Sequence, residues 1–108
     1  MKKGDIVLCA DKASDFTSKP RPAVVVQNTA YIAGKESVIV CPISTVLLDD
    51  ELAMKLLPTD RNGLHDICVI RADKLSAVKK SRVGKRIGAL TNEEMRRLDE
   101  VMRIWLNL

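Results

Sequence analysis

Arg21 is the first residue whose type and neighbours suggest chemistry. It lies between Pro20 and Pro22, and these prolines restrict the backbone on both of its sides. The apolar run 23–26 follows at once, so Arg21 is predicted to lie where a loop meets a strand. Its planar guanidinium carries donors that match phosphate oxygens, which predicts a residue that holds phosphate. The alternative is an arginine that only keeps a loop in solution.

Arg71 and Asp73 form a second arrangement with chemical potential. Two residues that are two positions apart on a strand share one face, so a strand over 66–73 would present a cation and a carboxylate together. One group could hold a phosphate while the other exchanges a proton. The alternative is an exposed ion pair of little energetic consequence.

A basic run follows these residues. The chain has 18 basic and 14 acidic residues and a formal net charge of +4, while acids cluster at 49–51 and 93–94. Such a run indicates either a track for a nucleic-acid backbone or an ordinary solvated face. Its members are Lys79, Lys80, Arg82, Lys85 and Arg86.

Four segments occur in a fixed order along the chain: Gly4–Leu8, Lys19–Val26, Val38–Thr45 and Val69–Asp73. In this order and at this spacing, the chain resembles the MazF/PemK/Kid family of toxin endoribonucleases. The resemblance extends from about Gly4 to the last predicted helix. It implies sequence-preferring cleavage of single-stranded RNA by attack of the 2′-hydroxyl, without metal or cofactor, giving 2′,3′-cyclic phosphate and 5′-hydroxyl ends. It also implies a cognate antitoxin and a homodimer as partners.

The resemblance implies roles for individual residues. Arg21 matches the catalytic arginine of the family's Arg-Pro motif, Asp73 would be the base, and Arg71 the acid or phosphate clamp. Charge stabilisation is favoured for both arginines, because a guanidinium is a poor proton acceptor. Ser44 and Thr45 match the family's Ser/Thr pair after the third strand, and Thr45 is preferred because it lies further into the loop. The alternative for this pair is strand-end hydrogen bonding.

Other residues are predicted to contact the substrate. Asp5 matches the family's acidic opening residue, where it orients a catalytic group or pairs with an arginine of the barrel. Phe16 stacks on a base or anchors its loop, although this loop departs from the family pattern by lacking His and Gln. The full predicted substrate-binding set is Asp5, Phe16, Lys19, Lys79, Lys80 and Arg82.

The strands that would position these residues are short and rich in Val and Ile. The 24–26 run lacks alternation, so both of its faces are predicted to be buried. Asp60–Gly63 is predicted to form a turn. The predicted strands are Asp5–Ala10, Ala23–Asn28, Ser37–Ile43, Ala53–Pro58, which rests on the resemblance, Asp66–Asp73 and Leu75–Val78.

The C-terminal helix is the clearest predicted element. Thr91 and Glu94 have the spacing of a capping box. An apolar stripe of Met95, Leu98, Met102 and Trp105 predicts packing on the sheet. Short strands followed by one late helix predict a mainly β, α+β domain over 1–108, and the resemblance implies a Src-homology-3-like barrel.

Composition limits the remaining possibilities. Apolar residues make up 46% of the chain and charged residues 30%, as in ordinary soluble domains. No apolar run approaches the ~20 residues of a membrane span, and no signal peptide is visible, so a cytoplasmic protein without membrane contact is expected. Cys9, Cys41 and Cys68 lie in apolar runs and are predicted to be buried hydrophobes, without a zinc site.

Two other functions are compatible with this sequence. The first is a non-enzymatic gyrase poison resembling CcdB, which Trp105 near the C-terminus suggests. Its place on the apolar stripe instead favours packing in the core. The second is a catalytically silent RNA-binding barrel, which would need the basic run but not Asp73.

Overall fold

The computed structural model describes residues 1–10 and 19–108. Within that part of the chain, seven strands pair antiparallel in a curved sheet, with one α-helix, α1 (Asn92–Leu106). Three short 3-10 helices are η1 (Thr29–Tyr31), η2 (Ala72–Lys74) and η3 (Lys80–Arg82). The strands are β1 (Asp5–Cys9), β2 (Arg21–Val25), β3 (Ser37–Ser44), β4 (Ala53–Leu56), β5 (Cys68–Arg71), β6 (Ser76–Lys79) and β7 (Val83–Ala89). The predicted α+β architecture, mainly β, is confirmed.

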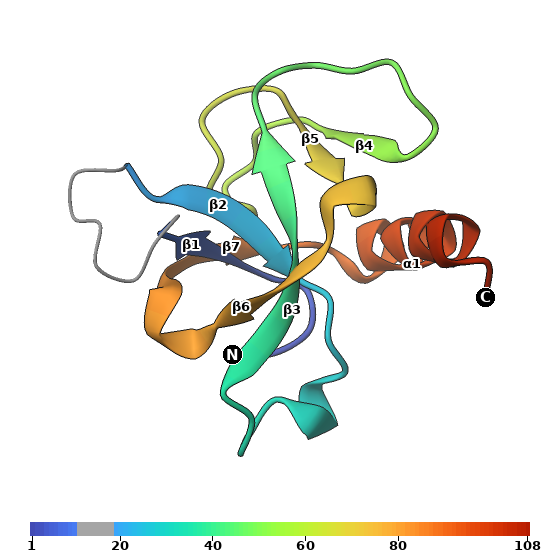
Figure 1. Ribbon diagram of the computed structural model, residues 1–108. Helices are drawn as coiled ribbons and strands as arrows, with labels where there is room; N and C mark the ends of the chain where they lie inside the picture. The colour runs from blue at the N-terminus through green and yellow to red at the C-terminus, as the bar shows by residue number, and fades with distance from the viewer. Residues whose placement is uncertain (11–18) are drawn as a thin grey trace.

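The central strand is β3, as Figure 1 shows. The strand order is β4-β5-β3-β2-β1-β7, and β6 also pairs with β3. The first half of β3 pairs with β6, with Val38 opposite Val78, and its last two residues pair with β5. Because β3 has several partners at different points along its length, the sheet bends around it.

Both faces of the sheet are buried. Ile6, Val24 and Cys41 belong to a cluster that includes α1, whereas Val25 and Val40 belong to a second cluster on the opposite face. Successive residues of a strand point to opposite faces, so a strand covered on both sides must be apolar at every position. The prediction for the valine run is confirmed at Val24 and Val25, which are both fully buried, whereas Val26 is only partly buried.

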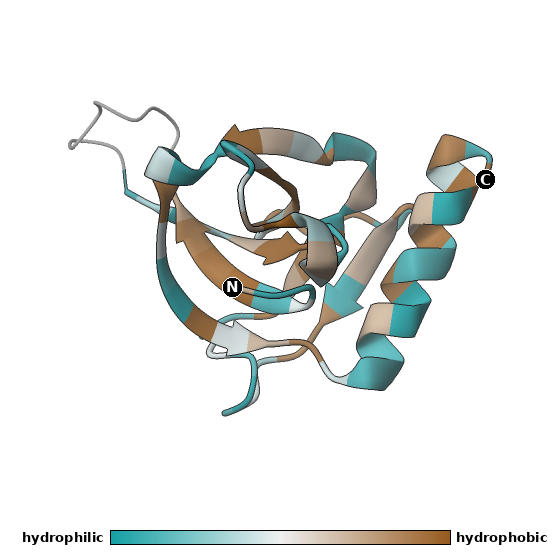
Figure 2. Cartoon of the chain, turned by 90° about the horizontal axis from the view of Figure 1, so that it is seen from below, coloured by the Kyte–Doolittle hydropathy of each residue, from teal (hydrophilic) through white to brown (hydrophobic). Residues whose placement is uncertain are grey.

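The start of α1 matches its prediction. Thr91 Oγ1 accepts a hydrogen bond from the Glu94 amide at 3.1 Å, and the Glu94 carboxylate accepts one from the Thr91 amide at 2.8 Å. Figure 2 shows alternating hydrophilic and hydrophobic segments along α1. Leu98 is fully buried, but Trp105 is 47% exposed. The predicted core position of Trp105 is therefore wrong, because burial along the stripe falls toward the carboxyl end of the helix.

Two strand boundaries differ from prediction in ways that affect candidate site residues. Strand β2 begins at Arg21, two residues earlier than expected, because Arg21 pairs with Cys9 of β1. Strand β5 ends at Arg71, and Asp73 lies in η2. The predicted sharing of one strand by Arg71 and Asp73 is therefore wrong.

The Asp60–Gly63 turn is confirmed, although it forms part of a longer connection between β4 and β5. Gly63 has a φ of +68°, in the region that glycine adopts without a steric penalty. A Cβ at Gly63 would also collide with the Ile87 carbonyl. The turn therefore packs the connection between β4 and β5 closely against β7.

The cysteines behave largely as predicted. Cys41 and Cys68 are buried and Cys9 is half-buried. Burial, and secondarily the negative charge of Asp73, raises the pKa of Cys41 to about 12, so this thiol stays protonated at neutral pH. Within residues 1–10 and 19–108, every helix is too short or too polar to span a bilayer.

We predict that Leu98→Ala lowers the free energy of unfolding by about 3 kcal/mol, because it removes a fully buried side chain and leaves a cavity. Urea denaturation measures the change. Ile104→Ala is the matched control on the same helix, since Ile104 is 61% exposed. Equal effects of the two changes would contradict the packing of α1 described above.

Candidate functional site

Pro42 of β3 lies at the centre of the candidate site. It pairs with Ala23 of β2, and the neighbouring Ile43 pairs with Ile70 of β5. Arg21 lies two residues before Ala23, and Arg71 directly follows Ile70. Because paired residues share a face and faces alternate along each strand, both arginines rise from one face. Their strands lie on either side of β3 and are about 10 Å apart at the backbone where both pair with it.

Ser44 rises from the same face, because it lies two residues after Pro42 and pairs with Val69 of β5. It does not lie beside Arg21. Figure 1 shows that the amino end of β2 and the carboxyl end of β3 diverge beyond their shared pairing. Arg21 therefore lies on one side of this divergence, and Ser44 and Arg71 lie on the other.

Arg21 is exposed at the start of β2. Among the residues that the structure describes, no acceptor engages its guanidinium. Pro20 and Pro22 restrict the backbone around it. As an exposed cation, Arg21 is accessible to an anionic ligand.

Arg71 is held in a different way. Its Nε donates to Oδ1 of Asp73 at 2.8 Å, and its Nη2 donates to Oδ2 at 2.6 Å. Each side chain is 22% exposed. The two parallel hydrogen bonds fix the plane of the guanidinium, and charge-assisted pairs of this kind are the strong ones. The structure thus joins the two residues that the sequence singled out.

The ion pair also sets their proton affinities. The hydrogen bonds from Arg71 hold the pKa of the Asp73 carboxyl below its ordinary value, and the same contact raises the pKa of Arg71. Asp73 is consequently ionised at neutral pH, with both oxygens engaged. A carboxylate in this state orients its arginine well and accepts a proton poorly.

Ser44 and Thr45 differ in their surroundings. Ser44 Oγ accepts a hydrogen bond from the Val46 amide at 3.1 Å, which is the strand-end role considered for this pair. Thr45 is exposed, and it follows the last residue of β3. The preference for Thr45 as the residue that faces the site stays a prediction.

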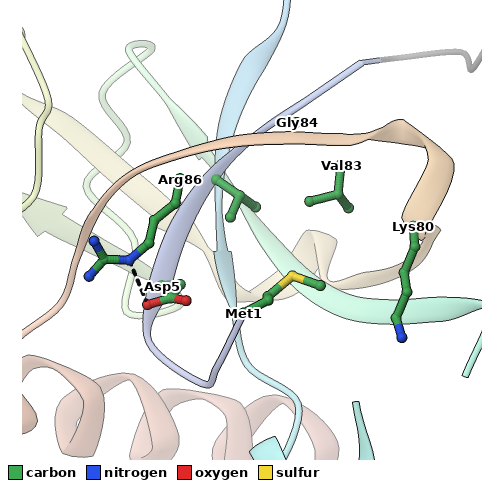
Figure 3. A pocket seen from close by; sticks show the side chains of 7 residues that line it. Met1, Asp5, Lys80, Val83, Gly84 and Arg86 are labelled. Atoms are coloured by element: carbon green, nitrogen blue, oxygen red, sulfur yellow. Dashed lines mark hydrogen bonds and ion pairs between the residues drawn. The ribbon is translucent and has the colours of Figure 1, made fainter. Parts of the chain in front are cut away.

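Asp5 is buried, with 3% of its side chain exposed. Its Oδ1 accepts from Arg86 Nε at 3.0 Å, and its Oδ2 accepts from the Lys2 amide at 2.9 Å. Figure 3 shows the contact with Arg86. Of the two roles considered, the structure has Asp5 pairing with an arginine of the sheet, and a buried carboxylate is not placed to touch substrate directly.

The predicted basic track is divided among three elements, β6, η3 and β7. Lys79 ends β6 and is exposed, whereas Lys80 and Arg82 belong to η3. Lys80 Nζ donates to the Ile32 carbonyl, and Arg82 Nε donates to the Ala10 carbonyl at 2.9 Å. These two cations therefore also anchor the backbone.

Two predicted contact residues precede β2. Lys19 is exposed and lies outside any strand, close to Arg21 in the chain. Phe16 lies outside the described residues. Among the described residues there is no group of three or more His, Cys, Asp or Glu side chains placed to hold a metal ion.

Sequence reasoning did not predict the specific pair of Asp5 and Arg86. These residues are 81 positions apart and meet only because β1 pairs with β7. The available signal was a lone acidic residue in an apolar strand, which needs a partner when buried. That signal indicates a cation but does not say which one.

Comparisons with known proteins place the chain in a family. A model of the PemK-like, MazF-like toxins of type II toxin–antitoxin systems matches residues 2–106. The chain belongs to this family. A probable endoribonuclease MazF of Mycolicibacterium smegmatis is 31% identical over the whole chain and 98% of that relative.

Solved structures of MazF-like toxins share the fold. The Mycobacterium tuberculosis toxin MazF-mt6 superimposes with a TM-score of 0.80 at 20% identity, over 98% of each chain. An endoribonuclease in complex with its cognate antitoxin, from a mycobacterial species, gives 0.82 at 19% identity over 100% of this chain and 96% of that one. The predicted family and fold are confirmed, and the relatives' names support the predicted class of enzyme, an endoribonuclease.

We predict that the carboxyl of Asp73 in this MazF-like toxin titrates below the ordinary value of about 3.9, because Arg71 stabilises its charged form. Stability from this pair is fully present above pH 3.9 and is lost as the pH falls through the folded-state pKa. NMR titration of the side-chain carboxyl carbon measures this. Arg71→Gln should raise the midpoint toward the ordinary value, and an unchanged midpoint would contradict the assigned cause.

Proposed function

We propose that this MazF-like toxin cleaves single-stranded RNA at a short preferred sequence, in the cytoplasm, without metal or cofactor. The observation that carries the proposal is the pair of arginines, Arg21 and Arg71, on one face around Pro42. In a family whose curated relative is named a probable endoribonuclease, such a face supports binding of a phosphodiester.

The proposed reaction needs no metal or cofactor. The RNA 2′-oxygen attacks the adjacent phosphorus as its hydroxyl gives its proton to solvent water, and the bond to the 5′-oxygen breaks as that oxygen takes a proton from solvent. The products carry a 2′,3′-cyclic phosphate and a 5′-hydroxyl. Negative charge grows on the phosphoryl oxygens in the transition state, where positioned donors have their largest effect.

Each site residue then has a part. Arg21 and Arg71 donate to the phosphoryl oxygens, and the Thr45 hydroxyl adds a neutral donor. Asp73 mainly holds Arg71 in place, since its lowered pKa makes it a weak base. Ser44 shapes the end of β3 through its bond to the Val46 amide.

One observation favours a second candidate. Trp105 is 47% exposed near the C-terminus, as a gyrase poison resembling CcdB would require. That function needs neither the Arg71–Asp73 pair nor Arg21. A catalytically silent RNA-binding barrel would need the arginines but not Asp73. Asp73→Asn therefore distinguishes the nuclease, which needs Asp73, from the other two functions, which do not.

We predict metal-independent cleavage of a long single-stranded RNA by the purified protein in EDTA, with ends mapped by sequencing and end-specific labelling. Arg21→Ala should lower the cleavage rate roughly 10²–10³-fold, because it removes one donor to the developing charge. Asp73→Asn should also lower the rate strongly, because an amide cannot hold Arg71 through two accepting oxygens.

Lys35→Ala is the matched control, since it removes one exposed positive charge outside the candidate site. Circular dichroism checks that each variant is folded. Absence of cleavage by folded wild-type protein would reject the proposal and make gyrase the next target. Cleavage unaffected by Arg21→Ala would reject the assigned site.

The proposal includes two protein partners, a second copy of the chain and a cognate antitoxin. An antitoxin is expected to present an acidic segment that folds onto the cationic face, given the net charge of +4. A solved neighbour is described in complex with its cognate antitoxin, which supports this partner class.

We predict that the cognate antitoxin inhibits RNA cleavage by competing for the Arg21–Arg71 face. A higher RNA concentration should therefore weaken antitoxin binding, and Arg21→Ala should weaken the binding of both RNA and antitoxin. Fluorescence anisotropy with labelled antitoxin measures the competition. Tight antitoxin binding without any effect on cleavage would contradict the shared surface.

A further inference from the structure

A hollow of about 290 Å³ lies over β1 and β7. Apolar side chains of Met1, Val7 and Val83 form part of its wall. Figure 3 shows Arg86 and Asp5 at one end and Lys80 at the other, with Met1 and Val83 between them. Apolar walls with a few polar groups at fixed positions are typical of a site for a small molecule.

Arg86 is the polar group best placed to recognise such a ligand. Its Nε is engaged by the buried Asp5, whose other oxygen is engaged by the Lys2 amide. Among residues 1–10 and 19–108, no acceptor occupies the two terminal nitrogens of Arg86. The side chain is 55% exposed, so Asp5 anchors one edge of the guanidinium and leaves its terminal pair of donors available.

The hollow lies on the same sheet face as the proposed catalytic arginine. Cys9 of β1 pairs with Arg21 on one side and with Val83 on the other. Paired residues share a face, so Arg21 and Val83 are separated by two strand spacings, about 10 Å. A single strand of RNA can cover that distance in a few nucleotides.

We propose that this hollow binds one guanine base of the RNA substrate, at a fixed short interval from the cleaved bond. The terminal nitrogens of Arg86 donate to O6 and N7 of the base, and the apolar walls contact its ring. Asp5 is a positioning residue for Arg86. The inference rests on the proposed function, since it assigns a specificity site to the same RNA.

Guanine fits better than the other ligands with adjacent acceptors. Guanine presents two neighbouring acceptors on one edge, whereas adenine presents an acceptor beside a donor that would face Arg86. A phosphate also presents two acceptors, but the apolar side chains of Met1, Val7 and Val83 carry no hydrogen-bond donor for it. Apolar contact suits the faces of a base, which proteins that read single-stranded RNA commonly cover.

Cleavage of a random-sequence RNA pool, followed by sequencing around every cut, tests the inference. We expect wild-type protein to favour guanine over adenine roughly 10-fold or more at one fixed position near the cut. Arg86→Ala should remove that preference. Arg86→Lys should also remove it, because an ammonium keeps the charge but not the planar pair of donors.

Lys85→Ala is the matched control, because Lys85 is the adjacent exposed cation and does not line the hollow. It should keep the guanine preference. An identical sequence profile for wild type and Arg86→Ala would overturn the inference. If Arg86→Ala left the cleavage-sequence profile unchanged but altered the oligomeric mass, the inference would also be overturned. The hollow would then belong to an interface between copies of the chain.

A binding measurement separates failure of this inference from failure of the proposed function. Guanosine, adenosine and inorganic phosphate are added in turn to isotope-labelled wild-type protein, with amide NMR shifts recorded. Shifts of the Gly84 and Arg86 amides with guanosine alone would support the base site even if no RNA were cleaved. Shifts with inorganic phosphate but not guanosine would overturn it.

Discussion

The position of β3 between several partner strands is the constraint on which the rest of the structure depends. One stretch pairs with β6, the middle with β2, and the last two residues with β5. Pro42 lies at the changeover and cannot donate a hydrogen bond to a neighbouring strand. The sheet therefore bends there, and residues from β2, β3 and β5 rise around one point of its surface.

This arrangement explains why two arginines on the same face are held so differently. Arg21 begins a strand that pairs with β1, and two prolines set its backbone. Arg71 ends a strand, so its direction depends on the first residues after it, and Asp73 in η2 supplies two hydrogen bonds. Arg21 is exposed and can attract an anionic ligand. Arg71 is held in one orientation and can align that ligand.

Local signals predicted much of this fold. The capping box at Thr91, the turn ending at Gly63 and the doubly buried valines of β2 each depend on neighbours in sequence. The end of β5 could not be predicted in that way, because it depends on where η2 packs against α1 and β3. The exposure of Trp105 depends likewise on how far the sheet extends beneath the helix.

The same distinction between sequence neighbours and distant contacts applies to the candidate site. Arg21 was visible because its prolines adjoin it, whereas the partner of Asp5 was not, because Arg86 comes from the other end of the chain. The pairing of Arg71 with Asp73 was predicted for the wrong geometric reason. A shared strand face was expected, but the 3-10 turn brings the carboxylate back over the strand end.

The basic run acquires a second explanation from its place in the sheet. Strand β7 is an edge strand, and its pairing with β1 shifts register twice, around Val7. Irregular pairing and exposed cations such as Lys85 both discourage the edge from pairing with another chain. The same irregularity moves Val83 and Arg86 out of simple alternation, and the hollow lies between them. Edge protection accounts for the charge of Lys85 without any ligand, whereas the guanidinium of Arg86, which the buried Asp5 anchors, is not needed for that purpose.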